Sequence, residues 1–221
     1  AGVLRPPATA ASTLQSIPIG VNDWTLKLSN QLEAVEAAGR LGFRAVEVSL
    51  GRSEDGRTLP LADGARQREY LQAFEKHGVA NGGTRVEMLH VNYLKDPQDK
   101  LARKWLADAI PISAKLGAKV LLVPFFGPQA LKTQADIEYV VGILRELGPE
   151  AERARVVLGL EDTLSAEDNV RLMELSRSTA VQTYYDIGNS SNQGYDILKE
   201  IRWLGKDRIC QMHWKDNPYF L

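Results

Sequence analysis

Short β-rich segments alternate with amphipathic helical segments along most of the sequence, and this alternation restricts the fold more than any other feature. Strands that are separated by helices pair in parallel, because the connecting helix returns the chain to the same end of the sheet. The sequence therefore predicts an α/β protein with a parallel sheet. The predicted strands are Ile17–Val21, Ala45–Ser49, Arg85–His90, Val120–Phe125, Val156–Glu161, Val181–Asp186 and Ile209–His213.

The length of the repeat separates two α/β architectures. The first predicted strand centres near Ile19 and the seventh near Gln211, so six repeats occupy 192 residues, or 32 residues each. A (β/α)₈ TIM barrel of about 250 residues has this period. An open doubly wound sheet is the alternative, but the glycine-rich phosphate loops that usually begin such sheets are absent. We predict a (β/α)₈ TIM barrel with seven strands in this sequence and the eighth strand and helix absent from it.

Composition sets the domain organisation and excludes several partners. Residues 1–16 are small, polar and proline-containing and are predicted to be a flexible lead-in, and 17–221 form the barrel domain. A net charge of −1 argues against a nucleic-acid partner, and no apolar run approaches the roughly 20 residues that cross a membrane. The single cysteine, Cys210, excludes an internal disulfide. A cytoplasmic location is expected, with an exported protein that has lost its signal peptide as the alternative, and homo-oligomerisation is left open.

Three successive strands end in a residue that can bind a metal. These residues are Glu161, Asp186 and His213, and the separations of 25 and 27 residues each correspond to one repeat. Adjacent parallel strands would bring the three side chains together at one mouth of the barrel. Two carboxylates and one imidazole suit Mn²⁺, Mg²⁺ or Zn²⁺ better than a metal that prefers thiolates. Binding is expected to weaken below about pH 6, where His213 gains a proton.

The alternation of side chains along a strand also orients the neighbours of these residues. If Asp186 and His213 face the interior of the barrel, Tyr184 and Gln211 face it as well. Cys210 is then expected to pack outward against the helices. Tyr184 is interpreted as a packing residue.

The segments GLED, YDIGN and MHWKD, in this order and spacing, resemble the sugar phosphate isomerase/epimerase family, also called the xylose isomerase-like barrel superfamily. The segment LGFRAVEV is similar to the second strand of that family. The resemblance implies that Glu161, Asp186 and His213 are three of four ligands to a divalent cation, with Mn²⁺ favoured and Mg²⁺, Co²⁺ and Zn²⁺ as alternatives. The fourth ligand, a glutamate, would lie on the eighth strand.

The same resemblance implies an activity. It points to isomerisation or epimerisation of a sugar, sugar phosphate or polyol through an enediolate, with Glu161 as a catalytic acid or base that moves a proton beside the carbonyl group. Two alternatives stay open. One is a metal-dependent phosphodiesterase like endonuclease IV, although the three histidines of this chain are few for a three-zinc site. The other is a non-catalytic relative that binds sugars.

Five further residues are candidates for contact with a carbohydrate substrate. Trp24 follows the first strand and could form a wall of the site or pack at the rim. Glu47 lies within the second strand and either contacts substrate or forms a buried ion pair. His90 ends the third predicted strand. Asn189 could bind a hydroxyl group or belong to a turn, and Lys215 could neutralise an oxyanion or pair with an acidic residue.

Overall fold

The computed structural model describes residues 18–90 and 94–215 of the 221-residue chain, without the side chains of Met88 and His90. The predicted lead-in of residues 1–16 lies outside this part of the chain. Within the described ranges, no helix is both long enough and apolar enough to cross a membrane.

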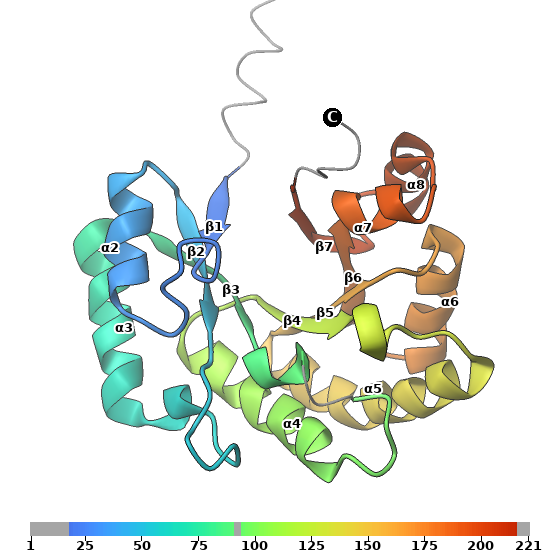
Figure 1. Cartoon of the computed structure of the whole chain (residues 1–221), viewed down its shortest axis with the longest axis horizontal. Coiled ribbons are helices and arrows are strands. Elements are labelled where there is room, and N and C mark those ends of the chain that lie inside the picture. The colour runs from blue at the N-terminus through green and yellow to red at the C-terminus, as the bar shows by residue number, and fades with distance from the viewer. Residues whose placement is uncertain (1–17, 91–93, 216–221) are drawn as a thin grey trace, which may run out of the picture.

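The described residues form one sheet of seven parallel strands whose spatial order is their order in the sequence. The sheet curves, and the strands β1 and β7 are its two edges (Figure 1). This arrangement is the barrel that the repeat length predicts, with seven of its eight strands. The strands are β1 (Gly20–Asn22), β2 (Ala45–Ser49), β3 (Ala80–Arg85), β4 (Val120–Phe125), β5 (Val157–Asp162), β6 (Val181–Asp186) and β7 (Ile209–His213).

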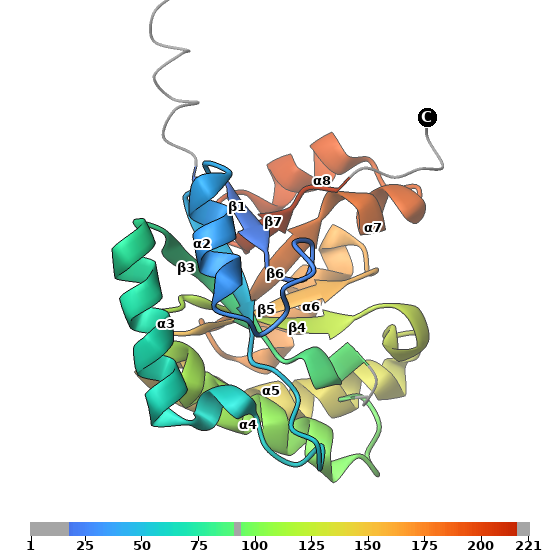
Figure 2. The same ribbon diagram turned by 60° about the vertical axis from the view of Figure 1, so that its left-hand side comes forward.

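Helices connect the strands and cover the outer, convex side of the curved sheet (Figures 1 and 2). The α-helices are α2 (Glu33–Arg40), α3 (Gly64–His77), α4 (Lys100–Lys115), α5 (Gln134–Ala154), α6 (Ala166–Ser176), α7 (Ile187–Asn192) and α8 (Ile197–Leu204). Short 3₁₀ helices follow β2, β3 and β4; they are η1 (Pro60–Ala62), η2 (Glu87–His90) and η3 (Gly127–Gln129).

The third strand is the one strand that the sequence places wrongly. The segment that was expected as Arg85–His90 shares only Arg85 with β3, and Glu87–His90 is the 3₁₀ helix η2. The true strand reads ANGGTR, and its glycines resemble a turn. They are needed because β2 approaches closely: a Cβ at Gly82 would lie 3.1 Å from the Cβ of Ala45, and Gly83 has a φ of 148°. Pairing with β2 and β4 therefore outweighs the low strand propensity of this segment.

Two apolar layers hold the sheet in place. The outer layer packs the sheet against the helices and includes Val48 of β2, Val123 of β4 and Leu160 of β5, all of which are fully buried. The inner layer is smaller and includes Leu122 of β4 and Tyr184 of β6. Because the outer layer occupies every second position of these strands, the remaining positions face the concave side, where a site can form.

A bulge in β7 changes the expected side of Cys210. Thr183 pairs with Ile209 and Tyr184 pairs with Gln211, so Cys210 is the extra residue of the ladder. Its side chain packs with the inner layer, where a Cβ at Gly159 would meet the Cys210 sulfur at 2.9 Å. The prediction that Cys210 packs outward is therefore wrong, because a bulge inserts a residue without reversing the side of the residues that follow it.

Candidate metal and active site

Glu161, Asp186 and His213 lie at the carboxyl ends of β5, β6 and β7, which are neighbouring strands. Asp186 and His213 are direct partners in the strand register. One ligand atom from each of the three side chains lies within 4.8 Å of the other two. The structure therefore brings together the three residues that the spacing of the sequence predicts, and metal binding by them stays a prediction.

The pKa values of all three groups are shifted from their usual values. Burial raises the pKa of the Glu161 carboxyl to about 7, against the opposing influence of His213. Burial alone would lower the pKa of His213, but the neighbouring carboxylates of Glu161 and Glu47 outweigh it and raise that pKa to about 10. His213 Nδ1 lies 3.2 Å from Glu161 Oε1 and 3.9 Å from Asp186 Oδ2. A protonated His213 thus supplies positive charge beside two carboxylates, the charge that a cation would otherwise supply.

Each carboxylate oxygen of Asp186 has a close partner. The backbone N–H of Asn189 donates to Asp186 Oδ1 at 2.8 Å, which caps α7, and Lys215 Nζ lies 2.7 Å from Oδ2. Burial opposes ionisation of Asp186, but the hydrogen bond to Glu161 and the Lys215 ammonium outweigh it and lower its pKa.

The donor set fits a divalent cation. Asp186 Oδ2 is fully buried and accepts no hydrogen bond of good geometry, although Lys215 lies close to it. A second carboxylate and an imidazole nitrogen converge on the same point. Buried carboxylates that face one another are costly to ionise without nearby positive charge, and a bound cation would reduce this cost.

The other ring nitrogen of His213, Nε2, faces a buried hydrogen-bond network that the sequence does not reveal. The Tyr184 hydroxyl donates to Glu47 Oε2 at 2.7 Å and lies 2.9 Å from His213 Nε2. Gln211 Nε2 donates to the same hydroxyl oxygen at 2.8 Å, and Asn22 Nδ2 donates to Glu47 Oε1 at 3.1 Å. Tyr184 is therefore more than the packing residue that was expected. The sequence could have indicated this role, because Tyr184 lies two residues before Asp186 on the same strand and therefore faces the same side of the sheet.

The predicted substrate contacts have different surroundings. Glu47 is 4% exposed and lies 3.5 Å from His213 Nε2, which matches the buried ion pair that was its alternative. Lys215 donates to Asn189 Oδ1 at 2.9 Å, so these two residues meet beside Asp186. Trp24 is 59% exposed, and the Arg85 guanidinium lies 4.8 Å from its ring centre. His90 belongs to η2 rather than to a strand end, and its side chain lies outside the described part.

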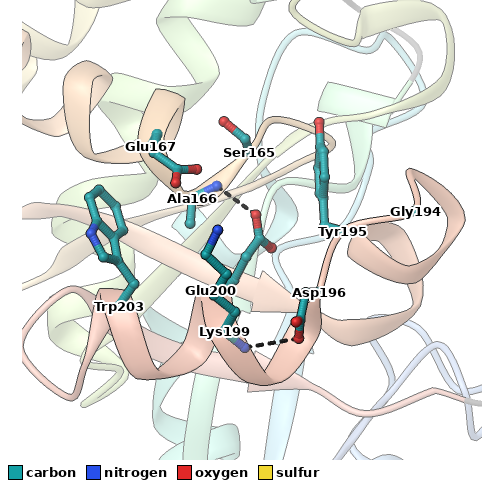
Figure 3. Close-up of a pocket in the computed structure, with 9 residues that line it drawn as sticks. All are labelled: Ser165, Ala166, Glu167, Gly194, Tyr195, Asp196, Lys199, Glu200 and Trp203. Atoms are coloured by element: carbon teal, nitrogen blue, oxygen red, sulfur yellow. Dashed lines mark hydrogen bonds between the residues drawn. The ribbon is translucent and has the colours of Figure 1, made fainter.

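A separate pocket lies between the helices α6 and α8, on the outer layer of the fold (Figure 3). It has a volume of about 340 Å³, and its walls include Tyr195, Glu200 and Trp203. Glu200 is fixed there by the Ala166 N–H, which donates to Oε1 at 2.8 Å, and by the Tyr185 hydroxyl, which donates to Oε2 at 2.9 Å. None of the three predicted ligands lines this pocket.

Comparisons with known proteins agree with the barrel fold. The sequence profile described as xylose isomerase-like TIM barrel matches residues 35–221. A 3-keto-D-glucoside 4-epimerase from E. coli has a similar structure, with 17% identity, a TM-score of 0.73, and coverage of 91% of this chain and 80% of that one. A D-psicose 3-epimerase from Clostridium cellulolyticum H10 is similar with 17% identity, a TM-score of 0.73, and coverage of 89% and 72%.

A sugar phosphate isomerase/epimerase from Parabacteroides distasonis is similar with 12% identity, a TM-score of 0.65, and coverage of 90% of this chain and 75% of that one. At these identities the similarities show the fold. No curated protein sequence matches this chain significantly.

Proposed function

This chain belongs to the xylose isomerase-like TIM barrel family, and we propose that it is a divalent-metal-dependent isomerase or epimerase of a small carbohydrate. The observation that carries the proposal is the meeting of Glu161, Asp186 and His213 at the ends of three adjacent strands. The structural neighbours that are sugar epimerases support the same reaction class.

Glu161, Asp186 and His213 would hold the cation, each through one ligand atom. Mn²⁺ is the favoured ion, with Mg²⁺, Co²⁺ and Zn²⁺ as alternatives, because oxygen and imidazole ligands suit them. When bound, the ion supplies electrostatic stabilisation for negative charge that develops on substrate oxygen atoms.

Glu161 is the proposed acid or base of the reaction. A carboxylate at this position can accept a proton from the substrate and return it, which is the property that general acid–base catalysis requires. The proton that it moves would be the one on the carbon beside the substrate carbonyl. Lys215, with its ammonium group 2.7 Å from Asp186 Oδ2, holds that carboxylate in place and adds positive charge near the developing oxyanion.

Trp24, Asn189 and Lys215 are the proposed contacts with the sugar. The Trp24 ring is exposed just beyond β1, and the Arg85 guanidinium stacks over it. An aromatic face of this kind can cover the apolar side of a sugar ring. The Asn189 amide and the Lys215 ammonium can bind hydroxyl groups, since both lie beside Asp186. His90 stays a proposal from the sequence alone.

The experiment that tests the function is a deuterium exchange reaction. The protein is loaded with Mn²⁺ or Co²⁺ and incubated in D₂O with a panel of ketoses, aldoses and 3-keto-glucosides, and the products are analysed by NMR and mass spectrometry. A new sugar with deuterium beside the carbonyl group is the expected result. A new sugar without deuterium would contradict proton transfer and indicate a hydride shift.

Two other results would overturn the function itself. Cleavage of DNA at abasic sites without turnover of any sugar would favour the phosphodiesterase alternative. Sugar binding without turnover, in protein shown by calorimetry to contain the metal, would favour the non-catalytic relative.

A further inference from the structure

We propose that Glu47 is a positioning residue for His213. A directional chain of hydrogen bonds, which starts at the backbone N–H of Trp24, fixes the proton of His213 on Nε2 and leaves Nδ1 free to bind the metal. The inference rests on the proposed function only in requiring that the site binds a divalent cation.

The chain starts from a group whose direction is certain. A backbone N–H can only donate, and that of Trp24 donates to Asn22 Oδ1 at 2.8 Å. The Asn22 amide is therefore oriented with its NH₂ group toward Glu47, and Nδ2 donates to Glu47 Oε1 at 3.1 Å. Glu47, as a carboxylate, accepts this bond and has its second oxygen available for another donor.

Tyr184 connects Glu47 to His213 and determines which atom donates in the contact with His213. Its hydroxyl carries one proton and donates it to Glu47 Oε2 at 2.7 Å. The same oxygen accepts from Gln211 Nε2 at 2.8 Å and lies 2.9 Å from His213 Nε2. Since the only phenolic proton points to Glu47, the contact with His213 requires Nε2–H to be the donor. The lone pair of a neutral His213 is then on Nδ1, the nitrogen that faces Glu161 and Asp186.

Burial shields the central link of this chain, the bond between Tyr184 and Glu47, from water. Glu47 is 4% exposed and Tyr184 is 1% exposed. Each Glu47 oxygen is already engaged, one with Asn22 and the other with Tyr184. Because Glu47 is buried and both of its oxygens are already hydrogen-bonded, it acts on the site through Tyr184 and His213. Partners of this kind on a metal-bound histidine typically change metal affinity 10–100-fold when they are altered.

The substitution Glu47→Gln tests the direction of these hydrogen bonds, because glutamine has nearly the same shape as glutamate but must donate through one of its two terminal atoms. Asn22 still presents an N–H group, so the new amide must turn its oxygen to Asn22 and its NH₂ group to Tyr184. The Tyr184 hydroxyl must then donate to His213 Nε2, which places the histidine proton on Nδ1. We expect the affinity for Mn²⁺ and Zn²⁺ to fall by at least about tenfold.

The double substitution Asn22→Asp with Glu47→Gln restores the original direction. The aspartate accepts from Trp24 N–H and from the new amide NH₂, so the amide oxygen again accepts from Tyr184. The total charge of the pair is unchanged. We expect the affinity to return to within about threefold of the unaltered protein, which no general loss of packing would produce.

A matched control is available outside the site. Glu200 is a buried glutamate that accepts the Ala166 N–H (Figure 3). Like Glu47, it also accepts a tyrosine hydroxyl, that of Tyr185. Glu200→Gln is expected to affect thermal stability to a similar degree and to leave metal affinity unchanged.

Calorimetric titration gives the affinities, and ¹⁵N NMR of the Zn²⁺-bound protein identifies the protonated nitrogen of His213. Zinc is used there because it is diamagnetic. The expected result is a proton on Nε2 in the unaltered protein and in the double variant. The proposal is overturned if Glu47→Gln binds metal as well as the unaltered protein, if the double variant binds as weakly as the single one, or if the proton lies on Nδ1. An unaltered protein that binds no divalent cation would overturn the proposed function too, whereas the other outcomes affect only this inference.

Discussion

Glu161 and Asp162 are consecutive carboxylates at the end of β5, and their side chains leave the strand on opposite sides of the sheet. Glu161 faces the concave side and lies 3.2 Å from His213 Nδ1. Asp162 faces the helical layer, where the Leu164 N–H and Asn169 Nδ2 each donate to Oδ1 at 2.9 Å. Burial raises the pKa of both groups to about 7. The two residues therefore allow the effect of a buried carboxyl group on function to be separated from its effect on stability.

Replacing Glu161 with glutamine should abolish proton exchange while preserving the fold. Glutamine keeps the size and one oxygen ligand but cannot act as a base. We expect deuterium incorporation into the sugar to fall by at least ~10²-fold. Single-turnover exchange in D₂O measures this effect, with Glu200→Gln as the control. Unchanged exchange would show that another group moves the proton.

Replacing Asp162 with asparagine should stabilise the protein at high pH. A folded-state pKa of about 7, raised from 3.8, means that the folded protein holds this proton more tightly than the unfolded chain does. Stability is therefore lost as the pH rises from about 4 to 7, and the loss corresponds to about 4 kcal/mol. The Asp162→Asn variant avoids this cost.

Chemical denaturation at a series of pH values tests this prediction. The variant should match the unaltered protein near pH 4 and exceed it increasingly up to about pH 7. Asp207→Asn, at an exposed position, is the control. A stability difference that does not change with pH would contradict the raised pKa.

Metal binding should strengthen with pH well above neutrality. The metal displaces the proton from His213, whose pKa is about 10 in the free site. Between about pH 7 and 9 the association constant should rise roughly tenfold per pH unit, and more steeply below pH 7, where Glu161 is also protonated. The sequence alone suggested weakening only below about pH 6, because it does not reveal the carboxylates around His213.

The number of protons released measures this effect directly. Calorimetry at pH 8 in buffers of different ionisation enthalpy should give close to one proton per metal ion. The variant His77→Gln should release the same number, since His77 lies at the end of α3. Release of no proton at pH 8 would show that His213 is neutral in the free protein.

Gly159→Ala should disturb the floor of the site. A Cβ there would lie 2.9 Å from the Cys210 sulfur, 3.0 Å from Val120 Cγ1 and 3.1 Å from Tyr184 Cδ2. Overpacking of this kind costs about 1–3 kcal/mol, and displacement of Tyr184 should also weaken metal binding. Gly142→Ala is the control: it lies on α5 with open space for a Cβ and should stabilise the helix by up to about 1 kcal/mol. Normal stability and affinity in Gly159→Ala would contradict the tight packing.

The sequence predicts the parallel sheet and the three strand-end residues because both follow from spacing. Repeats of about 32 residues recur whatever the details of packing, and equivalent positions of adjacent strands must meet. Features set by contacts between strands are not predicted. The strand ANGGTR is glycine-rich because β2 lies close to it, and the bulge at Cys210 depends on pairing with β6. The role of Glu47 likewise depends on Tyr184, which is 137 residues distant in the sequence.

The position of His213 on β7 has a consequence for how the site opens. Among the described residues β7 pairs only with β6, and all five of its residues are half-buried, unlike those of β5 and β6. A strand whose residues are only half-buried opens by local unfolding more readily than a strand in the core. A cation bound by Glu161, Asp186 and His213 would join three strands and oppose that motion. Metal occupancy should thus slow amide hydrogen exchange in β7 far more than in β4, so the ion and the strand hold each other in place.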